Sequence, residues 1–223
     1  MAARFEWFGA TAGKDSSLEL APLCRLAVTA AQNDPHGDGG QQIRRRFWDT
    51  PAALVLTHGR EIRVARQGTP AFTGLVLHRD KKWRFKFWYP DGWHRFDLAP
   101  GHEGVLYAPE PGDYSTSFSV EAKDIGVKTQ ESDLDALKEG FLEGLKSLDG
   151  LQIEWQDAWV AGALIGLEAK YTFREGEATR KRWVRLLYEG SRQFHVVAQG
   201  SSPEEYDYWL PMLNEMMMTL QID

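Results

Sequence analysis

A two-residue periodicity in the last third of the sequence limits what this chain can fold into. Apolar side chains recur at every second position within residues 163–173, 182–188 and 194–198. Successive side chains of a β-strand point to opposite faces of a sheet, whereas a helix repeats every 3.6 residues and cannot reproduce this pattern. Gly176 and Gly190 lie in short polar segments between these runs, where glycine favours tight turns. The pattern therefore predicts neighbouring antiparallel strands that form a meander.

Two other segments show helical spacing. Apolar side chains three or four residues apart form one stripe, which consists of Leu134, Leu137, Phe141, Leu145 and Leu148. Ser132 precedes this stripe as a candidate N-cap, and Gly150 follows it as a candidate terminating residue. A second helix is predicted to begin at Ser202-Pro203, because serine caps a helix start and proline fits its first position. Pro211 predicts a kink or a break further along this helix.

The segment before these helices predicts additional strands. Aromatic and basic residues alternate over residues 83–89, and a second alternating segment, residues 94–98, follows the turn Pro90-Asp91-Gly92. We therefore expect these two segments to form a hairpin. Residues 104–107 and 116–122 predict two more short strands. The predicted fold class is α+β, an antiparallel sheet meander packed against helices.

The composition changes near residue 67, and this change divides the chain into two parts. Arginine is far more frequent than lysine before it, and no periodicity is sustained there, although residues 53–57 and 61–64 predict a hairpin. We therefore expect residues 1–66 to be an irregular N-terminal extension and residues 67–223 to form the α+β domain. A hydrophobic share of 43% with 26% charged residues fits a chain with a buried core.

Charge and targeting signals exclude several classes of function. The formal net charge of −6 opposes general binding to nucleic acid or to an anionic membrane surface. No run approaches the ~20 apolar residues that cross a bilayer, and the charged start, with Arg4 and Glu6, lacks the apolar run of a signal peptide. Cys24 is the single cysteine, so no intramolecular disulfide can form. These features predict a cytoplasmic protein that binds neither nucleic acid nor membranes.

Motifs for catalysis and metal binding are incomplete. Residues 9–14 depart from a phosphate-binding loop in their glycine spacing, and Asp15 follows where a serine or threonine would hold magnesium. A segment that resembles a calcium loop starts at Asp34, but Arg45 stands at the position of its essential glutamate. No two histidines have the helical i, i+4 spacing and no cysteine pair exists, so no metal site or cofactor is predicted. We therefore expect no catalysis.

Two features are candidates for a binding surface, and one histidine is set aside. The basic hairpin, which could dock an acidic partner or protect a sheet edge from aggregation, comprises Arg174, Arg180, Lys181, Arg182, Arg185 and Arg192. Trp88 and Trp183 alternate with the predicted inward residues and would mark an interface if they reach the surface. His195 shares a strand face with Gln193 and Gln199, and we interpret it as a surface histidine rather than a catalytic one.

Several of these segments together resemble the PsbP-like superfamily, which includes the photosystem II extrinsic protein PsbP and the Ran guanine-nucleotide release factor. The likeness rests on the strand end Phe87-Trp88-Tyr89-Pro90-Asp91-Gly92-Trp93, the strand of residues 104–109, the stripe from Leu134 to Leu148 and the helix start at residues 202–206. The resemblance implies an α/β/α sandwich and a non-enzymatic role in binding or assembly. No functional residue of a known member matches a position of this sequence.

Two hypotheses for the function follow. The first is a non-catalytic binding or assembly module that contacts another protein through a sheet edge or through the basic hairpin. The alternative is a small-molecule binding protein or an enzyme with an aromatic-lined pocket between the sheet and the helices. The sequence leaves self-association open.

Overall fold

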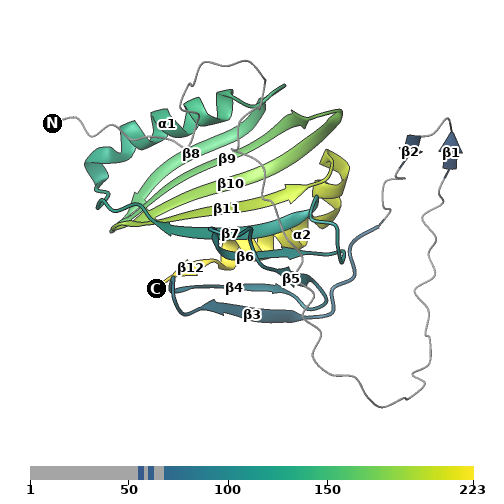
Figure 1. The fold of residues 1–223 in the computed structure, drawn as a ribbon, viewed down its shortest axis with the longest axis horizontal. Helices are drawn as coiled ribbons and strands as arrows, with labels where there is room; N and C mark the ends of the chain where they lie inside the picture. The colour runs from purple at the N-terminus through teal and green to yellow at the C-terminus, as the bar shows by residue number, and fades with distance from the viewer. Residues whose placement is uncertain (1–54, 58–59, 63–67) are drawn as a thin grey trace, which may run out of the picture.

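An antiparallel sheet of seven strands forms the centre of the computed structural model (Figure 1). The structure describes residues 55–57, 60–62 and 68–223. The strand order is β5-β6-β7-β11-β10-β9-β8. The strands are β5 (His94–Phe96), β6 (Glu103–Ala108), β7 (Ser117–Asp124), β8 (Gln152–Ala161), β9 (Leu164–Glu175), β10 (Ala178–Glu189) and β11 (Arg192–Gly200). The consecutive pairing of β8, β9, β10 and β11 confirms the predicted meander.

A smaller sheet lies against the central one. It has the order β12-β4-β3 and consists of β3 (Leu75–Asp80), β4 (Phe85–Pro90) and β12 (Gln221–Ile222). Because β4 pairs with β3, and β5 pairs with β6, the predicted hairpin around Pro90-Asp91-Gly92 is wrong. The physical reason is that β4 buries Phe85 and Phe87 against the central sheet, so the turn after Pro90 leads from one layer to the next.

Part of the N-terminal prediction can be compared with the structure. β1 (Val55–Thr57) pairs antiparallel with β2 (Arg60–Ile62), as the predicted hairpin requires. The motif-like segments at residues 9–14 and 34–45, and the rest of the predicted extension up to residue 54, lie outside the described residues.

Helix α1 (Leu134–Lys146) packs on one face of the central sheet. A short 3₁₀ helix, η1 (Glu131–Asp133), precedes it, and the cap is formed by Gln130 and Asp133 rather than by the predicted Ser132. The apolar stripe of α1 lies over β8 and β9, and it belongs to a buried cluster that includes Leu137, Phe141, Leu145, Leu167, Tyr171, Val184 and Leu186. Gly150 adopts a φ of 60°, which glycine allows cheaply after a helix, as predicted.

Helix α2 (Pro203–Thr219) packs on the opposite face of the central sheet, together with the smaller sheet. The hydroxyl of Ser202 accepts a hydrogen bond from the Glu205 amide at 3.2 Å, which confirms the predicted cap. Pro211 lies inside the continuous helix, so the predicted break does not occur. Neither α-helix within residues 68–223 is long and apolar enough to cross a membrane.

The two faces of the central sheet are covered unequally. Helix α1 contacts β8 and β9, whereas α2 contacts β10 and β11 and β4 of the smaller sheet. On the α1 face, β11 contributes only Val197 to the buried apolar cluster, and no residue of β6 or β7 belongs to that cluster. The side chains of β6, β7 and β11 on this face therefore lie beside α1 rather than beneath it.

Candidate functional site

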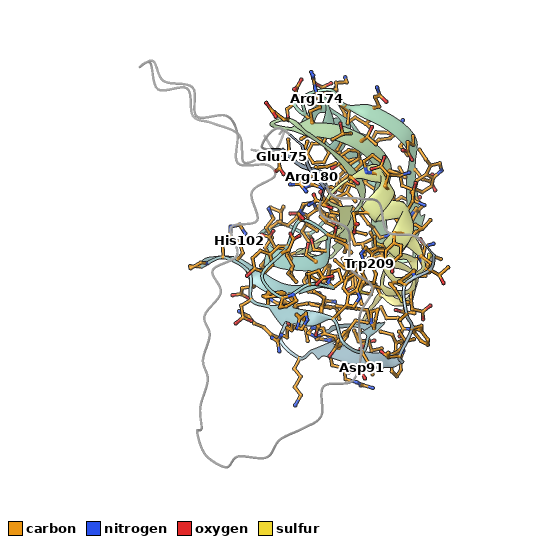
Figure 2. All side chains as sticks on the ribbon, turned by 90° about the vertical axis from the view of Figure 1, so that its right-hand side faces the viewer. Asp91, His102, Arg174, Glu175, Arg180 and Trp209 are labelled. Carbon is orange, nitrogen blue, oxygen red and sulfur yellow. The ribbon has the colours of Figure 1, made fainter. Side chains whose placement is uncertain are left out.

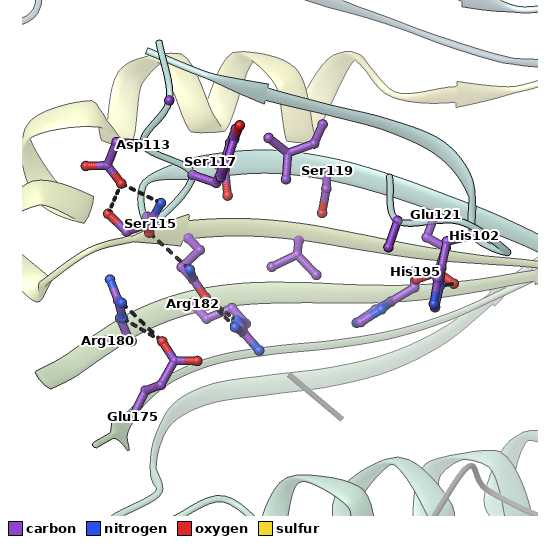
Figure 3. Close-up of a pocket in the computed structure, with 16 residues that line it drawn as sticks. His102, Asp113, Ser115, Ser117, Ser119, Glu121, Glu175, Arg180, Arg182 and His195 are labelled. Atoms are coloured by element: carbon purple, nitrogen blue, oxygen red, sulfur yellow. Dashed lines mark hydrogen bonds and ion pairs between the residues drawn. The ribbon is translucent and has the colours of Figure 1, made fainter. Parts of the chain in front are cut away.

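The part of the sheet beside α1 forms the floor of a pocket of about 400 Å³, which we call the sheet groove (Figure 3). Its walls come from the β5–β6 connection with His102, the β6–β7 loop with Asp113 and Ser115, and the β9–β10 turn with Glu175. Figure 2 shows His102, Glu175 and Arg180 on one side of the molecule and Trp209 of α2 toward the other. The groove therefore opens on the face of the sheet opposite α2.

Strand register places the floor residues in three rows. The pairs across β10, β11 and β7 are Arg182–Gln199–Ser117, Val184–Val197–Ser119 and Leu186–His195–Glu121. The outer rows are polar where they line the groove, and the middle row presents Val197 and Ser119, with Leu106 of β6 beside them. Segments that are far apart in the sequence thus supply one continuous floor.

Arg182 is the buried cation of the groove. Its side chain is only 7% exposed, and its Nε donates a hydrogen bond of 3.0 Å to Gln199 Oε1. The guanidinium lies 4.7 Å from the centre of the Phe173 ring, a cation–π geometry. Gln199 is itself fixed, because its Nε2 donates to the Ser115 carbonyl at 3.0 Å. These contacts hold the guanidinium in one orientation.

Arg180 lies at the mouth of the groove, where its charge is paired. Its guanidinium forms an ion pair of 3.1 Å with Glu175 and donates a hydrogen bond of 3.2 Å to the Ser201 carbonyl. Because Glu175 supplies the opposite charge, Arg180 contributes less positive potential than its formal charge implies.

The other end of the groove contains an acidic group between two histidines. Glu121 Oε1 lies 2.7 Å from His102 Nδ1, and the two side chains form a hydrogen bond. His195 stands directly opposite Glu121 on the neighbouring strand. Burial lowers the pKa of His195 to about 4; Glu121 acts to raise this pKa, whereas Arg182 and Lys123 lower it. The His195 imidazole is therefore neutral at pH 7.

Two buried hydroxyl groups line the groove between these ends. Ser117 and Ser119 are 7% and 2% exposed. Neither hydroxyl has a hydrogen-bond partner among the residues that the structure describes. Neither hydroxyl oxygen is among the fully buried side-chain atoms that lack a partner, so both can offer a hydrogen bond to a ligand in the groove.

The described residues contain no group of three or more histidine, cysteine, aspartate or glutamate side chains that could hold a metal ion.

The basic hairpin predicted from the sequence does not form one patch. Lys181 and Arg185 point to the α2 side, where Lys181 pairs with Asp207 at 3.2 Å and Arg185 donates to the Met217 carbonyl at 2.8 Å. Two other members form separate ion pairs: Arg174 pairs with Asp149, and Arg192 pairs with Glu189. Arg180 and Arg182 are the members that line the groove. Alternation along β10 separates cations that are neighbours in sequence.

The two tryptophans predicted to mark an interface also lie in different environments. Trp88 is exposed on the smaller sheet, as expected of a surface residue. Trp183 is 5% exposed, and its Nε1 donates to Glu168 Oε2 at 3.1 Å, so its assignment to an aromatic surface is wrong. The physical reason is that odd-numbered residues of β10 face the α2 side, where the core covers Trp183.

The pocket itself also differs from the expectation. His195 is half-buried and lines the groove, and its surroundings lower its pKa, so it is less exposed to water than a freely solvated surface histidine. The lining is mainly polar, whereas an aromatic lining was expected. The large aromatic side chains pack instead between the two sheets, where Phe85, Phe87 and Phe118 are buried.

Sequence reasoning missed most of the groove. The alternation of Ser117, Ser119 and Glu121 with Phe118 and Val120 indicates a strand with one polar face. That signal was present in the sequence. What it does not contain is the strand order that places Arg182 and His195 beside this polar face.

Comparisons with known proteins identify the fold of this chain. No protein-family model and no curated protein sequence matches the chain. The solution structure of PsbP (CyanoP) from the cyanobacterium Synechocystis sp. PCC 6803 aligns with a TM-score of 0.50 and 14% identity, over 71% of this chain and 98% of that one. The chain therefore has a PsbP-like α+β fold, as the resemblance implied.

Two other solved structures are similar at lower scores. The Ran-binding protein Mog1p from Saccharomyces cerevisiae aligns with a TM-score of 0.44 and 12% identity, over 67% of this chain and 95% of that one. PA94 from Pseudomonas aeruginosa, a protein of unknown function, aligns with a TM-score of 0.45 and 13% identity, over 67% of this chain and 97% of that one.

The low pKa of His195 predicts a pH dependence of stability. In the unfolded chain this histidine binds a proton below its ordinary pKa of about 6.5, whereas the folded protein binds it only below about 4. The free energy of unfolding should therefore fall as the pH decreases from about 6.5 to about 4. In His195→Gln, the loss between pH 7.5 and pH 5, measured by urea unfolding, should shrink by on the order of 1–2 kcal/mol.

A matched control is His94→Gln, because His94 is exposed on β5. It should leave the pH dependence unchanged. Burial also lowers the pKa of His78 to about 4, so part of the acid sensitivity should persist in every variant. An identical loss of stability in His195→Gln and in the unmodified protein would contradict the lowered pKa of His195.

Proposed function

We propose that this protein is a non-catalytic binding module whose ligand places an anionic group in the sheet groove, against Arg182. The observation that carries this proposal is a guanidinium that is 7% exposed and that lines a pocket of about 400 Å³. Pockets for small molecules have volumes of roughly 300–1,000 Å³.

The surroundings of Arg182 favour an anion. Its contacts with Gln199 and Phe173 fix its direction. A carboxylate or phosphate oxygen in the groove would form a charge-assisted hydrogen bond, which is stronger at a buried site than in water. Ser117, in the same row of the floor, adds a hydroxyl to this end of the groove.

The serine residues of the groove support binding rather than nucleophilic catalysis. A catalytic serine needs a general base within hydrogen-bond reach. Within residues 68–223, neither Ser117 nor Ser119 forms a hydrogen bond with His195 or His102. We therefore propose that the groove holds its ligand without transforming it.

This proposal predicts that a simple carboxylate binds at Arg182. In a titration with hexanoate, the Nε–H resonance of Arg182 should shift and saturate, because the guanidinium gains a new acceptor. Arg182→Gln should weaken binding by at least about tenfold, which corresponds to roughly 1.4 kcal/mol. The measurement is NMR of the arginine side chains, with affinity taken from the titration curve.

The matched control is Arg174→Gln, since Arg174 lies outside the groove and pairs with Asp149. It should leave the affinity unchanged. Equal affinity in Arg182→Gln and in the unmodified protein, or shifts that concentrate at Arg174, would refute anion binding in the groove.

A second candidate function is the docking of another protein on β8. This strand is the last of the central sheet and is exposed along most of its length. Ile153 and Trp155 present apolar surface, 40% and 44% exposed, and Lys170 lies 5.8 Å from the Trp155 ring centre. A strand edge can pair with an added strand of a partner. The register irregularity between Ile153 and Trp155 would confine such pairing to the regular part from Trp155 to Ala161.

The double variant Ile153→Ser and Trp155→Ser tests this second candidate. It should remove a stoichiometric partner from a pull-down out of native lysate, because it deletes exposed apolar contacts without touching the buried core. Phe72→Ser is the control, since Phe72 is also exposed but precedes β3. Retention of the same partner by the double variant would eliminate β8 as the docking site.

A further inference from the structure

We infer that strand β3, the edge of the smaller sheet, binds an extended segment of a partner protein in which acidic and apolar side chains alternate. Figure 1 shows β3 at the outer margin of the smaller sheet, which packs on the face of the central sheet opposite the groove. The inference therefore goes beyond the proposed function and does not require an anion at Arg182.

The backbone of β3 has a free side among the described residues. β3 is the last strand in the order β12-β4-β3, and Leu77 stands opposite Trp88. The Trp88 amide donates to the Thr219 hydroxyl at 3.0 Å rather than to β3, so Leu77 and Trp88 form a non-hydrogen-bonded pair. In such a pair the backbone groups of Leu77 point away from β4, and alternation points those of Leu75 and Arg79 the same way. These residues offer the amides and carbonyls that an added strand requires.

The hairpin of β3 and β4, residues 75–90, is basic although the chain is acidic. It contains five basic side chains and one acidic one, Asp80, whereas the formal net charge of the whole chain is −6. The basic members are Arg79, Lys81, Lys82, Arg84 and Lys86. This local excess of positive charge favours an acidic partner at the hairpin, while the rest of the molecule repels large polyanions.

Nearby carboxylates balance only part of this charge. Lys82 pairs with Glu103 at 2.5 Å. Lys86 pairs with Asp223 at 2.9 Å, and Lys86 and then the two arginines lower the pKa of Asp223, so this one carboxylate serves three cations. The side chains that are exposed and have no ion pair or hydrogen bond among the described residues are those of Arg79, Lys81 and Arg84.

Exposed apolar surface accompanies these cations. Trp88 is 41% exposed on the outer face of the smaller sheet, beside Leu77, and Val76 is 37% exposed on the other face. Alternate side chains of an added strand point to the same two faces. Acidic side chains on the outer face would approach Arg79, which shares that face with Leu77, and apolar ones on the inner face would cover Val76. The ligand class is therefore a strand of alternating acidic and apolar residues.

The free backbone favours a peptide over other anionic partners. A peptide in the extended conformation supplies donors and acceptors at the spacing of a strand, whereas a lipid surface or a nucleic acid supplies charge without this ladder. A second copy of β3 is a poor occupant, because it would place one cationic edge against another.

The probe is a synthetic peptide of three Glu-Val repeats with blocked ends, added to the full chain. At saturation, the amides of Leu77 and Arg79 should exchange their hydrogens at least about tenfold more slowly than in the free protein, because they gain acceptors. The amides of Val76 and His78, which face β4, are the internal control and should change little. The measurement is amide hydrogen exchange by NMR.

Two variants separate charge from backbone pairing. Arg79→Gln with Arg84→Gln should weaken binding at least about tenfold, through lost charge-assisted hydrogen bonds, whereas Arg174→Gln on the central sheet should not. Leu77→Pro removes an amide that faces the edge, where proline is tolerated. It should abolish binding, whereas Leu77→Ala, which keeps the amide, should retain it.

The remaining outcomes overturn the inference. Equal affinity for three Glu-Pro repeats, which keep the charge but lack alternate amides, would refute strand addition. Slow exchange of the Leu77 and Arg79 amides in the free protein would refute the free edge. Binding of phosphatidylserine vesicles or single-stranded DNA without binding of the Glu-Val peptide would assign the cations to another anion. If Leu77→Pro does not fold, as judged by its amide spectrum, the two peptides on the unmodified protein decide the question.

Discussion

The central sheet is about 29 Å wide, because its seven strands lie about 4.8 Å apart, whereas a helix with its side chains is about 10–12 Å wide. Helix α1 can therefore cover only part of its face, and it packs over β8 and β9. On the strands that α1 does not cover, the side chains that point to this face must tolerate water. Ser117, Ser119 and Glu121 meet this requirement on β7, and they thereby provide the polar floor of the groove.

The opposite face is closed by α2 and the smaller sheet. A residue of β10 is therefore buried in the core or lines the groove according to the face to which its side chain points. Arg182 points into the groove, whereas its neighbour Trp183 is buried on the α2 side and donates to Glu168. Arg185 also donates to Glu168, at 3.1 Å, so the cations of one strand serve different faces. A cluster of basic residues in a sequence is therefore weak evidence for a basic surface when the cluster lies on a strand with two covered faces.

The sequence was most informative where structure depends on local pattern. The meander and the Ser202 cap follow from periodicity and from neighbouring residues alone, and both were predicted. The pairing of β4 with β3 was not predicted, because it depends on which layer buries Phe85 and Phe87. The groove was missed for a similar reason. Ser117 and Arg182 are joined only through the register of β7, β11 and β10, and no local pattern specifies that register.

The central claim is that Glu121, whose side chain is 23% exposed, lies on the ligand-accessible floor of the groove while its neighbour Val120 lies in the closed core. Cysteine labelling tests this claim directly in a Cys24→Ser background, where an introduced cysteine is the only thiol. The account predicts that the thiol of Glu121→Cys reacts with methyl methanethiosulfonate in the folded protein, whereas that of Val120→Cys, which faces the opposite side of β7, reacts only after unfolding. Equal protection of both thiols would contradict the existence of the groove.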